Sequence, residues 1–462
     1  MKDGIVARGL KKVRNLLREH SATGGLSERQ AAQLLVQLQD CAAALGGEAS
    51  ARQRATRLAQ TYLALDDEGR TAFLRLIATG FGPDPQAVEK AHAQYQAALN
   101  SDAQWTAESV LRSALRSVRL RILAQFDTLP QGVKFLVDLR SDLLRLQAKD
   151  PALRGLDREL EAHLGTWFNV GFLELERITW NSPAVLLEKL IEYEAVHAIR
   201  SWSDLKNRLD SDRRCYAFFH PRMPMEPLIF VEVALVDELA DNVQHLLDEK
   251  APLLDATQAK TAIFYSISST QTGLRGVSFG NFLLKRVVED LQRDFPRLTT
   301  FSTLSPIPTL RRWADKNPEV WGQVFTSEMV ERVARHAATA GFSVSNAQDI
   351  QILLTDAAWA THPSLARALQ TGLARLAARY LLQAKSAQDR PYDPVARFHL
   401  GNGARIERIN PLADTSPNGL QQSYGMMVNY LYDPANIESN VEAFSRNGVV
   451  AASGVVRRAA RD

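Results

Sequence analysis

The sequence predicts two domains: an all-α helical bundle over residues 1–175, followed by an α/β domain over residues 176–462. Three observations support this division. At 462 residues, the chain is too long for one ordinary hydrophobic core. Up to about residue 175, apolar residues recur at intervals of three and four, the spacing of amphipathic helices. Beyond that point, short β-branched and aromatic runs alternate with helical patterns.

The composition is typical of a soluble globular protein, with 45% hydrophobic and 23% charged residues. The chain has 55 Lys+Arg and 52 Asp+Glu, and this near balance gives no electrostatic reason to expect nucleic acid as a partner. No run approaches the ~18 apolar residues of a membrane span. Cys41 and Cys215 lie far apart, which fits a reducing compartment, and we expect a cytoplasmic location.

The first twenty residues, MKDGIVARGLKKVRNLLREH, are basic and amphipathic. This pattern resembles a transit peptide, but Asp3 and Glu19 argue against one because transit peptides are poor in acidic residues. We therefore favour a first amphipathic helix.

Two segments of the helical region show the amphipathic pattern most clearly, residues 27–45 and 106–126. Ser27 followed by Gln30 is typical of a capping box. Few β-branched or aromatic runs occur here, so we expect a helical bundle. Because such bundles pack or oligomerise, we expect a homo-oligomer, a dimer or tetramer, formed through the helical domain.

The second domain begins with predicted strands at 214–219, 227–236, 261–268 and 298–304. A glycine-bearing loop and an apolar-periodic helix separate the last two of these strands. Strand, loop, helix and strand form a βαβ unit, so these two strands should be parallel neighbours. Helices return from about 315 to 385, and two final strands are predicted at 398–411 and 423–433.

The loop before the helix contains Gly276-Val277-Ser278-Phe279-Gly280, which spells G-x-S-x-G, the nucleophile elbow of serine hydrolases. An elbow requires the strand to run directly into the serine. Here about eight polar or glycine residues intervene, so the spacing argues against Ser278 as a nucleophile. A serine hydrolase is kept as an alternative.

The same loop is also suited to binding an anion. Gly273, Gly276 and Gly280, with a helix beginning near Gly280, can present backbone N–H groups, and Arg275 adds positive charge. Neither a P-loop nor a G-x-G-x-x-G pattern is present, so a nucleoside triphosphate or NAD is not expected. A diphosphate-tailed ligand and a glycine-rich turn that binds nothing are about equally supported.

Ser305 follows the predicted strand 298–304, and ligands of open α/β sheets bind at the carboxyl ends of strands. We expect Ser305 on the same edge as the glycine loop, although it could instead cap the helix after Pro306-Ile307-Pro308. His399, at the start of a predicted strand, is either a general acid or base or a core histidine bonded to backbone.

Glu194 and His197 are spaced three residues apart in YEAVH, which could place two metal ligands on one helix face. Without further clustered ligands, a surface or interhelical pair is favoured. No metal site is predicted.

Several long strings resemble the malonyl-CoA decarboxylase family: AIFYSISSTQTGLRGVSFGNFLLKRVVEDLQRDFPRLTTFSTLSPIP (262–308), DPVARFHLGNGARIERIN and SYGMMVNYLYD. The resemblance covers most of residues 175–435 and also fits the helical region. It implies a helical N-terminal domain and a catalytic domain with the N-acetyltransferase-like fold, into which the helices at about 315–385 are inserted.

The resemblance also implies site residues. Ser305 and His399 would be the catalytic pair. The loop that grips coenzyme A would consist of Arg275, Gly276, Val277, Ser278, Phe279, Gly280 and Asn281. Animal members of the family carry glutamate at the position of Ser278, which counts against a nucleophilic hydroxyl there. Asn429 and Tyr430 are second-tier candidates because they lie late in the last predicted strand.

The activity implied is decarboxylation of malonyl-CoA to acetyl-CoA and CO2 through a thioester enolate. The thioester carbonyl is the electron sink, so we expect neither a metal nor an organic cofactor, and coenzyme A is part of the substrate. Ser305 and His399 would bind the leaving carboxylate, with His399 as proton donor to carbon. A coenzyme A-dependent acyltransferase of the same fold and a serine hydrolase using Ser278 are the alternatives.

Overall fold

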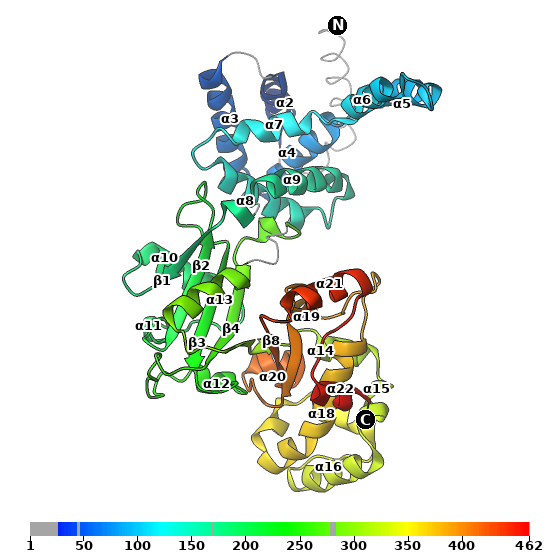
Figure 1. The fold of residues 1–462 in the computed structure, drawn as a ribbon. Helices are drawn as coiled ribbons and strands as arrows, with labels where there is room; N and C mark the ends of the chain where they lie inside the picture. Colours follow the sequence, from blue (N-terminus) through cyan, green and yellow to red (C-terminus); the bar gives the residue numbers. More distant parts are fainter. Residues whose placement is uncertain (1–25, 44–46, 169, 278–282, 462) are drawn as a thin grey trace. The chain divides into compact units, whose positions relative to one another are not determined.

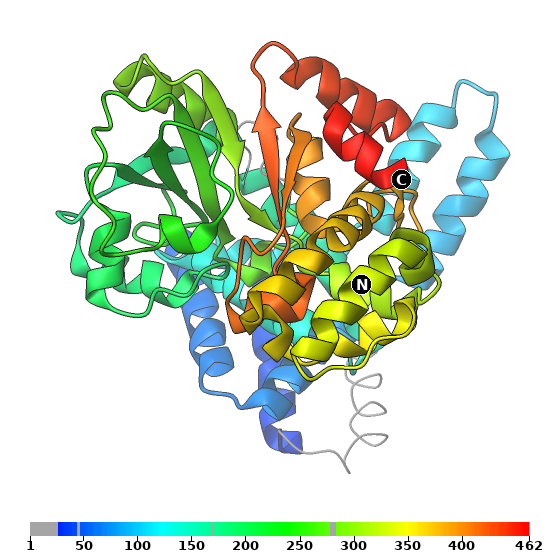
Figure 2. The same ribbon diagram turned by 90° about the horizontal axis from the view of Figure 1, so that it is seen from below.

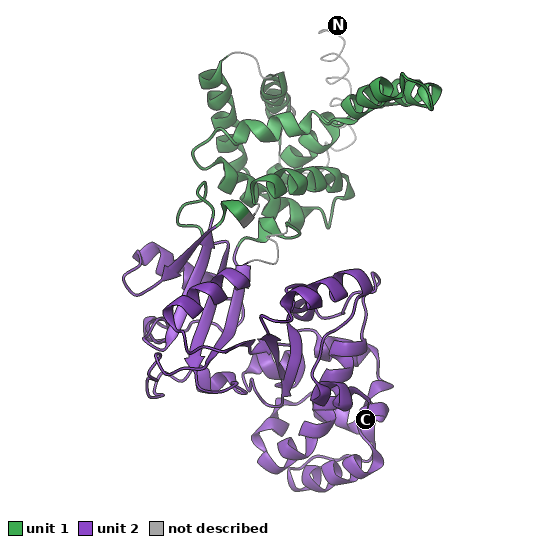
Figure 3. Cartoon of the chain, in the orientation of Figure 1, with its two compact units in different colours: residues 1–173, 220–226, 271–279 green, residues 174–219, 227–270, 280–462 purple. Residues whose placement is uncertain are grey.

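The computed structural model describes residues 26–43, 47–168, 170–277 and 283–461. The chain divides into two compact units (Figure 3). Unit 1 contains residues 1–173, 220–226 and 271–279, and unit 2 contains residues 174–219, 227–270 and 280–462. The helix predicted over the first twenty residues lies outside the described residues.

Unit 1 is helical (Figure 1). Its α-helices are α2 (Glu28–Ala43), α3 (Glu48–Leu63), α4 (Asp67–Gly80), α5 (Pro85–Ala98), α6 (Gln104–Leu115), α7 (Arg119–Phe126), α8 (Gly132–Leu146) and α9 (Arg154–Trp167). Short 3-10 turns lie at η1 (Pro151–Leu153), η2 (Val170–Phe172) and η3 (Thr272–Leu274). The last of these turns comes from the loop after the third predicted strand, far from the other helices in sequence.

Local sequence determines where several of these helices begin. The Ser27 N–H donates to the side-chain oxygen of Gln30, and the Gln30 N–H donates to Ser27 Oγ, so the predicted capping box is confirmed. Asp66 caps α4 by accepting the N–H of Gly69. Each cap satisfies a backbone donor that the first turn of a helix leaves unpaired.

The single helix predicted over 106–126 is wrong, because the structure divides it into α6 and α7. Ser117 lies at the break and donates from its hydroxyl to the carbonyl oxygen of Phe81. The hydroxyl oxygen of Ser117 in turn accepts the N–H of Arg119 at 3.0 Å. A serine side chain thus starts a new helix within a continuous amphipathic pattern.

Unit 2 contains a mixed sheet of eight strands within the described residues. The strands are β1 (Glu174–Ile178), β2 (Arg213–Phe219), β3 (Ile229–Val236), β4 (Thr261–Ser269), β5 (Thr300–Thr303), β6 (Ser305–Pro306), β7 (Arg405–Asn410) and β8 (Met427–Tyr432). Their order is β1-β2-β3-β4-β5-β8-β6, with β7 also paired to β8. All neighbours are antiparallel except β4 and β5, which are parallel.

The predicted βαβ unit is confirmed, because β4 and β5 are parallel neighbours and α13 (Leu283–Asp294) lies between them in sequence. Strand β4 is buried along most of its length, as its dense apolar sequence predicted. The predicted adjacent strands at 214–219 and 227–236 correspond to β2 and β3, which pair antiparallel. A register shift between Glu232 and Val233 interrupts the pairing of β3 with β4.

The helices of unit 2 are α10 (Ala184–Tyr193), α11 (Trp202–Arg208), α12 (Val243–Leu246), α13, α14 (Leu310–Lys316), α15 (Val320–Val324), α16 (Ser327–Thr339), α17 (Ala347–Leu353), η4 (Ala357–Thr361), α18 (Pro363–Gln383), α19 (Pro394–Gly401), α20 (Pro417–Ser423), α21 (Ile437–Asn447) and α22 (Gly454–Arg461). They include some beside the sheet, such as α13, and others, such as α15 and α16, that pack mainly on other helices (Figures 1 and 2). The long helix α18 packs against α16 and α22.

The strand predicted over 398–411 is wrong in its first part, where the chain forms α19. Asp393 accepts the N–H groups of Val395 and Ala396, and Pro394 occupies the first turn, where its missing N–H costs nothing. Gly403, with φ at +84°, lets the chain turn after the helix. Only Arg405–Asn410 is a strand, and His399 therefore lies on a helix.

Among the described residues, no helix is both long enough and apolar enough to cross a membrane.

Candidate active site

Ser305 lies where β5 ends and the short β6 begins. Its partner in β8 is Val428, and Leu304 separates it from Thr303, the last residue of β5. Ser305 Oγ donates to Thr303 Oγ1 at 2.8 Å, and Thr303 Oγ1 also accepts the N–H of Tyr430 at 3.1 Å. Ser305 does not cap the next helix, because α14 begins at Leu310 with Thr309 as its N-cap residue.

His399 reaches Ser305 from α19, 94 positions further along the chain. The distance between Ser305 Oγ and His399 Nε2 is 3.2 Å. Both residues are buried, Ser305 with 6% and His399 with 3% of its surface exposed. The structure thus brings together the two side chains predicted to be catalytic.

Two tyrosines of β8 surround the imidazole of His399. The hydroxyl of Tyr432 lies 2.7 Å from His399 Nδ1. The Tyr430 ring stacks on the imidazole, with ring centroids 4.5 Å apart and planes inclined by 23°. Tyr432 was not among the predicted residues. It lies two positions after Tyr430, so period-2 alternation along the last predicted strand would have placed both on one face.

One set of proton positions is consistent with the three side-chain contacts that join Tyr432, His399, Ser305 and Thr303. Tyr432 donates to His399 Nδ1, His399 Nε2–H donates to Ser305 Oγ, and Ser305 donates to Thr303 Oγ1. Burial raises the pKa of the Tyr432 phenol well above its usual value, so this group keeps its proton and can donate. We assign His399 as the neutral tautomer protonated on Nε2.

Burial also lowers the pKa of His399 to about 3. An imidazolium in this position loses the solvation it has in water, and among the described residues no carboxylate interacts with it closely enough to compensate. The histidine is therefore neutral across the physiological pH range.

Asp393 anchors the helix that carries His399. Its Oδ1 accepts two backbone N–H groups at the start of α19, each at 2.9 Å. Its Oδ2 accepts hydrogen bonds from Tyr380 and Thr309, each at 3.2 Å. Burial raises the pKa of Asp393 above its usual value, although these hydrogen bonds oppose the rise. Two side chains and a helix terminus thus fix the position of α19.

The second-tier candidates have different surroundings. The Asn429 amide donates to the carbonyl oxygens of Thr303 and Ala240 and accepts from Asn410. These hydrogen bonds tie β8 to its neighbours. The phenol oxygen of Tyr430 is buried and has no hydrogen-bond partner within the described part of the chain.

The predicted coenzyme A loop is described only in part. Arg275, Gly276 and Val277 belong to unit 1, whereas Ser278, Phe279, Gly280 and Asn281 lie outside the described residues. Gly276 has φ at +88°, a conformation that favours glycine. The expectation that this loop shares a sheet edge with Ser305 stays a prediction.

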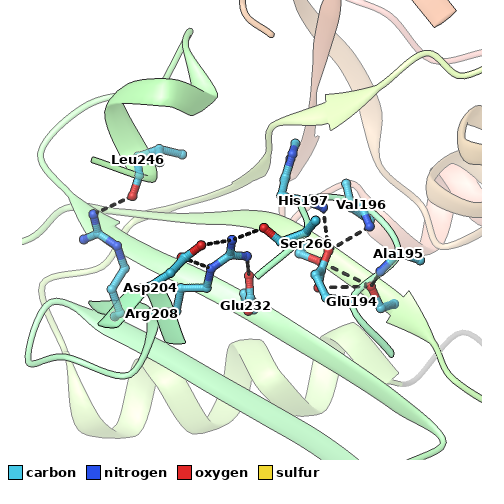
Figure 4. A network of polar contacts seen from close by, with 12 residues as sticks. Glu194, Ala195, Val196, His197, Asp204, Arg208, Glu232, Leu246 and Ser266 are labelled. Carbon is cyan, nitrogen blue, oxygen red and sulfur yellow. Dashed lines mark hydrogen bonds and ion pairs between the residues drawn. The ribbon is translucent and has the colours of Figure 1, made fainter. Parts of the chain in front are cut away.

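Glu194 and His197 do not form the predicted pair on a helix face, because α10 ends at Tyr193. One carboxylate oxygen of Glu194 accepts the N–H groups of Val196 and His197, and Ser266 Oγ donates to the same carboxylate (Figure 4). Among the described residues, no group of three or more His, Cys, Asp or Glu could hold a metal ion.

Arg208 joins two further acids in the same buried region (Figure 4). Its guanidinium lies 2.8 Å from Asp204 and 3.0 Å from Glu232 of β3. This network connects α11 to the sheet at Glu232, one of the two residues between which the pairing of β3 with β4 shifts register.

The family model described as malonyl-CoA decarboxylase C-terminal domain matches residues 171–462. The model of the N-terminal domain of the same family matches residues 81–168. The chain belongs to the malonyl-CoA decarboxylase family. The resemblance stated from the sequence strings is thereby confirmed.

Curated relatives in the malonyl-CoA decarboxylase family support the same assignment. The mitochondrial malonyl-CoA decarboxylase of Rattus norvegicus is 40% identical over 379 residues, which cover 79% of this chain and 76% of that protein. The mitochondrial enzyme of Anser anser anser is 37% identical over 414 residues, 85% of this chain and 80% of that protein.

Solved structures of the family confirm the predicted fold class. The malonyl-CoA decarboxylase of Rhodopseudomonas palustris is 42% identical, with a TM-score of 0.82 over 93% of this chain and 99% of that chain. The protein from Agrobacterium vitis is 39% identical, with a TM-score of 0.81 over the same shares. A helical N-terminal region followed by a mixed sheet with one parallel pair agrees with the acetyltransferase-like fold implied by the resemblance.

Proposed function

We propose that this chain converts malonyl-CoA to acetyl-CoA and CO2, with Ser305 and His399 as its catalytic pair and without a metal or organic cofactor. Family membership supports the activity. The observation that carries the catalytic assignment is the 3.2 Å contact between Ser305 Oγ and His399 Nε2 in a buried setting. Burial matters here because water would compete for the hydrogen bond between the two side chains if the pair were exposed.

The substrate provides its own electron sink. When the bond between the α-carbon and the carboxylate breaks, its electron pair moves into the thioester carbonyl and forms an enolate. The protein must bind the carboxylate, stabilise the enolate and supply one proton to the α-carbon. Ser305 and His399 both carry hydrogen-bond donors that suit a carboxylate.

The buried histidine can also supply the proton. A carboxylate bound beside His399 favours the imidazolium, so substrate binding raises the pKa of His399 from its low value near 3 and lets it take up a proton. When neutral CO2 departs, the negative charge moves from the carboxylate to the enolate. The imidazolium becomes a strong acid again and protonates the α-carbon, forming the new C–H bond. Each turnover consumes one proton and returns His399 to its neutral state.

The loop from Arg275 to Asn281 is proposed to bind the pyrophosphate of coenzyme A. Support comes from the glycine with positive φ at 276 and from the cationic side chain at 275. In this proposal Ser278 is a loop residue, and its hydroxyl takes no part in bond breaking.

A direct assay tests the proposed function. The protein is incubated with malonyl-CoA and a metal chelator in D2O, and CO2 and acyl products are measured by mass spectrometry. We expect equal amounts of CO2 and acetyl-CoA, with one deuterium in the acetyl methyl group. Malonate with free coenzyme A, together with fluorophosphonate labelling of Ser278, would support the hydrolase. Acyl transfer to an amine without CO2 would support the acyltransferase, and loss of activity with the chelator would contradict the metal-free route.

A further inference from the structure

Arg140 of α8 has an almost inaccessible charged side chain, with 1% of its surface exposed. Its Nη1 donates to two carbonyl oxygens of the glycine loop, that of Gly273 at 2.8 Å and that of Arg275 at 2.7 Å. Nε and Nη2 donate to Asp157 at 3.0 Å and to Glu161 at 2.9 Å. All five residues belong to unit 1 (Figure 3).

The loop forms a tight turn at this point. Arg275 has φ −57° and ψ 128°, and Gly276 has φ +88°. The Val277 N–H donates to the carbonyl oxygen of Leu274 at 3.0 Å. These are the features of a type II turn, with Arg275 and Gly276 at its two central positions. The turn type requires positive φ at the second central residue, which explains the glycine at 276.

Close packing against helices holds this turn in place. A Cβ atom at Gly273 would lie 1.8 Å from the carbonyl oxygen of Val137, one turn before Arg140 on α8. A Cβ atom at Gly276 would lie 2.6 Å from a carboxylate oxygen of Glu161. Both glycines therefore allow the loop backbone to approach groups beside Arg140.

We infer that Arg140 is a positioning residue for coenzyme A, because it fixes the orientation of the peptide between Arg275 and Gly276. This inference rests on the proposed function, which assigns pyrophosphate binding to the same loop. The C=O and N–H of a trans peptide point in opposite directions. Because Arg140 holds the Arg275 carbonyl, the Gly276 N–H points away from Arg140 and is oriented as a fixed donor for an anion.

A guanidinium suits this position better than an ammonium. Its planar group reaches two loop carbonyls and two carboxylates at once, whereas a lysine is a flexible point charge. Asp157 and Glu161 compensate the buried charge of Arg140 from successive turns of α9. The two carboxylates thus hold the Arg140 guanidinium in place by ion pairs, and the guanidinium orients the loop by its hydrogen bonds to the loop carbonyls.

A comparison of two substrates distinguishes an effect of Arg140 on coenzyme A binding from an effect on the stability of the protein. We would compare malonyl-CoA with malonyl-pantetheine, which lacks the nucleotide and its pyrophosphate, in the full-length protein and in Arg140→Met. We expect KM for malonyl-CoA to rise about tenfold, equivalent to ~1.4 kcal/mol of lost binding. The kcat for both substrates and the KM for malonyl-pantetheine should stay within about twofold. The KM of Arg140→Lys for malonyl-CoA should lie between those of the parent protein and Arg140→Met. Arg140→Lys serves as the test variant if Arg140→Met does not fold.

Arg119→Met is the matched control. Arg119 is also a buried arginine of the helical unit, and it pairs with Glu159 at 3.4 Å. Its loss should lower Tm and leave the ratio of the two KM values unchanged.

Equal KM changes for both substrates in the Arg140 variants, or the same ratio in Arg119→Met, would overturn the inference. Measuring the binding of free coenzyme A by calorimetry tests the role of Arg140 without depending on catalysis. Failure of the inference can therefore be told apart from failure of the proposed function. Weaker binding by Arg140→Met supports the inference even if no CO2 is released, and equal binding contradicts it even if the decarboxylase assay succeeds.

Discussion

The imidazole of His399 is excluded from water, yet each ring nitrogen has one hydrogen-bond partner. Tyr432 lies at Nδ1 and Ser305 at Nε2. The stacked ring of Tyr430 covers one face of the imidazole. This setting keeps the histidine neutral and fixes its tautomer. In the proposed mechanism, His399 takes up a proton only when an anion is bound. The proposed chemistry depends on this property.

Removing the Tyr432 hydroxyl tests the tautomer assignment. Tyr432→Phe leaves Nδ1 buried without a donor, which costs about 1–3 kcal/mol and allows the other tautomer to form. We expect kcat to fall about tenfold, while KM for malonyl-CoA changes by less than about twofold. Steady-state kinetics give these values, and ¹⁵N NMR of the histidine reports the tautomer directly.

Tyr62→Phe is the matched control for this substitution. Tyr62 is a buried tyrosine of unit 1 whose hydroxyl donates to Asp142 at 2.9 Å. It should lower stability without changing kcat. Normal kcat in Tyr432→Phe together with an unchanged histidine spectrum would show that Tyr432 has no role in positioning His399.

Strands and helices with a regular pattern were predictable, and α19 was not. The sequence around His399 alternates apolar and polar residues closely enough to suggest a strand. The helix depends on the carboxylate of Asp393, which accepts hydrogen bonds from Tyr380 and Thr309, two residues that are not part of α19. Those partners lie 13 and 84 positions away, so no local pattern contains the information. The Asp-Pro pair before the helix was the available signal.

The buried network of Arg208 and Glu232 joins α11 to β3 (Figure 4). Burial raises the pKa of Glu232 to about 8, from a usual value near 4.5. Between these two pH values, Glu232 therefore keeps its proton in the folded protein and loses it in the unfolded chain. The contribution of Glu232 to stability is fully present below pH 4.5 and is lost as pH rises toward 8.

Glu232→Gln tests this pH dependence, because glutamine mimics the protonated side chain and does not titrate. We expect the Tm of the variant, relative to the parent, to rise steadily from pH 5 to pH 8, at up to ~1.4 kcal/mol of unfolding free energy per pH unit. Melting curves at four pH values measure the trend. The exposed Glu192→Gln on α10 is the control, and its Tm difference should not vary in this way. A constant difference for Glu232→Gln would contradict the assignment.

At the scale of the whole molecule, length, periodicity and β-rich runs were sufficient to predict a helical region followed by a mixed α/β region. They could not predict that residues 271–279, which follow β4 in sequence, belong to the helical unit. That arrangement depends on the close approach of Gly273 to α8 and on the bonds of Arg140. Contacts made across more than a hundred residues leave no periodic pattern in the sequence.

The predicted homo-oligomer also concerns the molecule as a whole. Helix α6 of unit 1 has no buried residues and exposes large apolar side chains, among them Trp105 at 76%. Such side chains favour association. Light scattering should give two or four times the chain mass of 51.4 kDa, and Trp105→Ser should lower the value. Trp202→Ser, at an exposed tryptophan of unit 2, is the control, and a parent protein that stays at one chain mass would contradict the prediction.

We propose that Ser305 and His399 together carry out the decarboxylation. The most direct measurement is kcat for CO2 release from malonyl-CoA by Ser305→Ala and His399→Asn, with Tm and coenzyme A binding recorded for each. We expect each substitution to lower kcat by at least about 10²-fold while coenzyme A binding is retained. Near-normal kcat in either folded variant would contradict it.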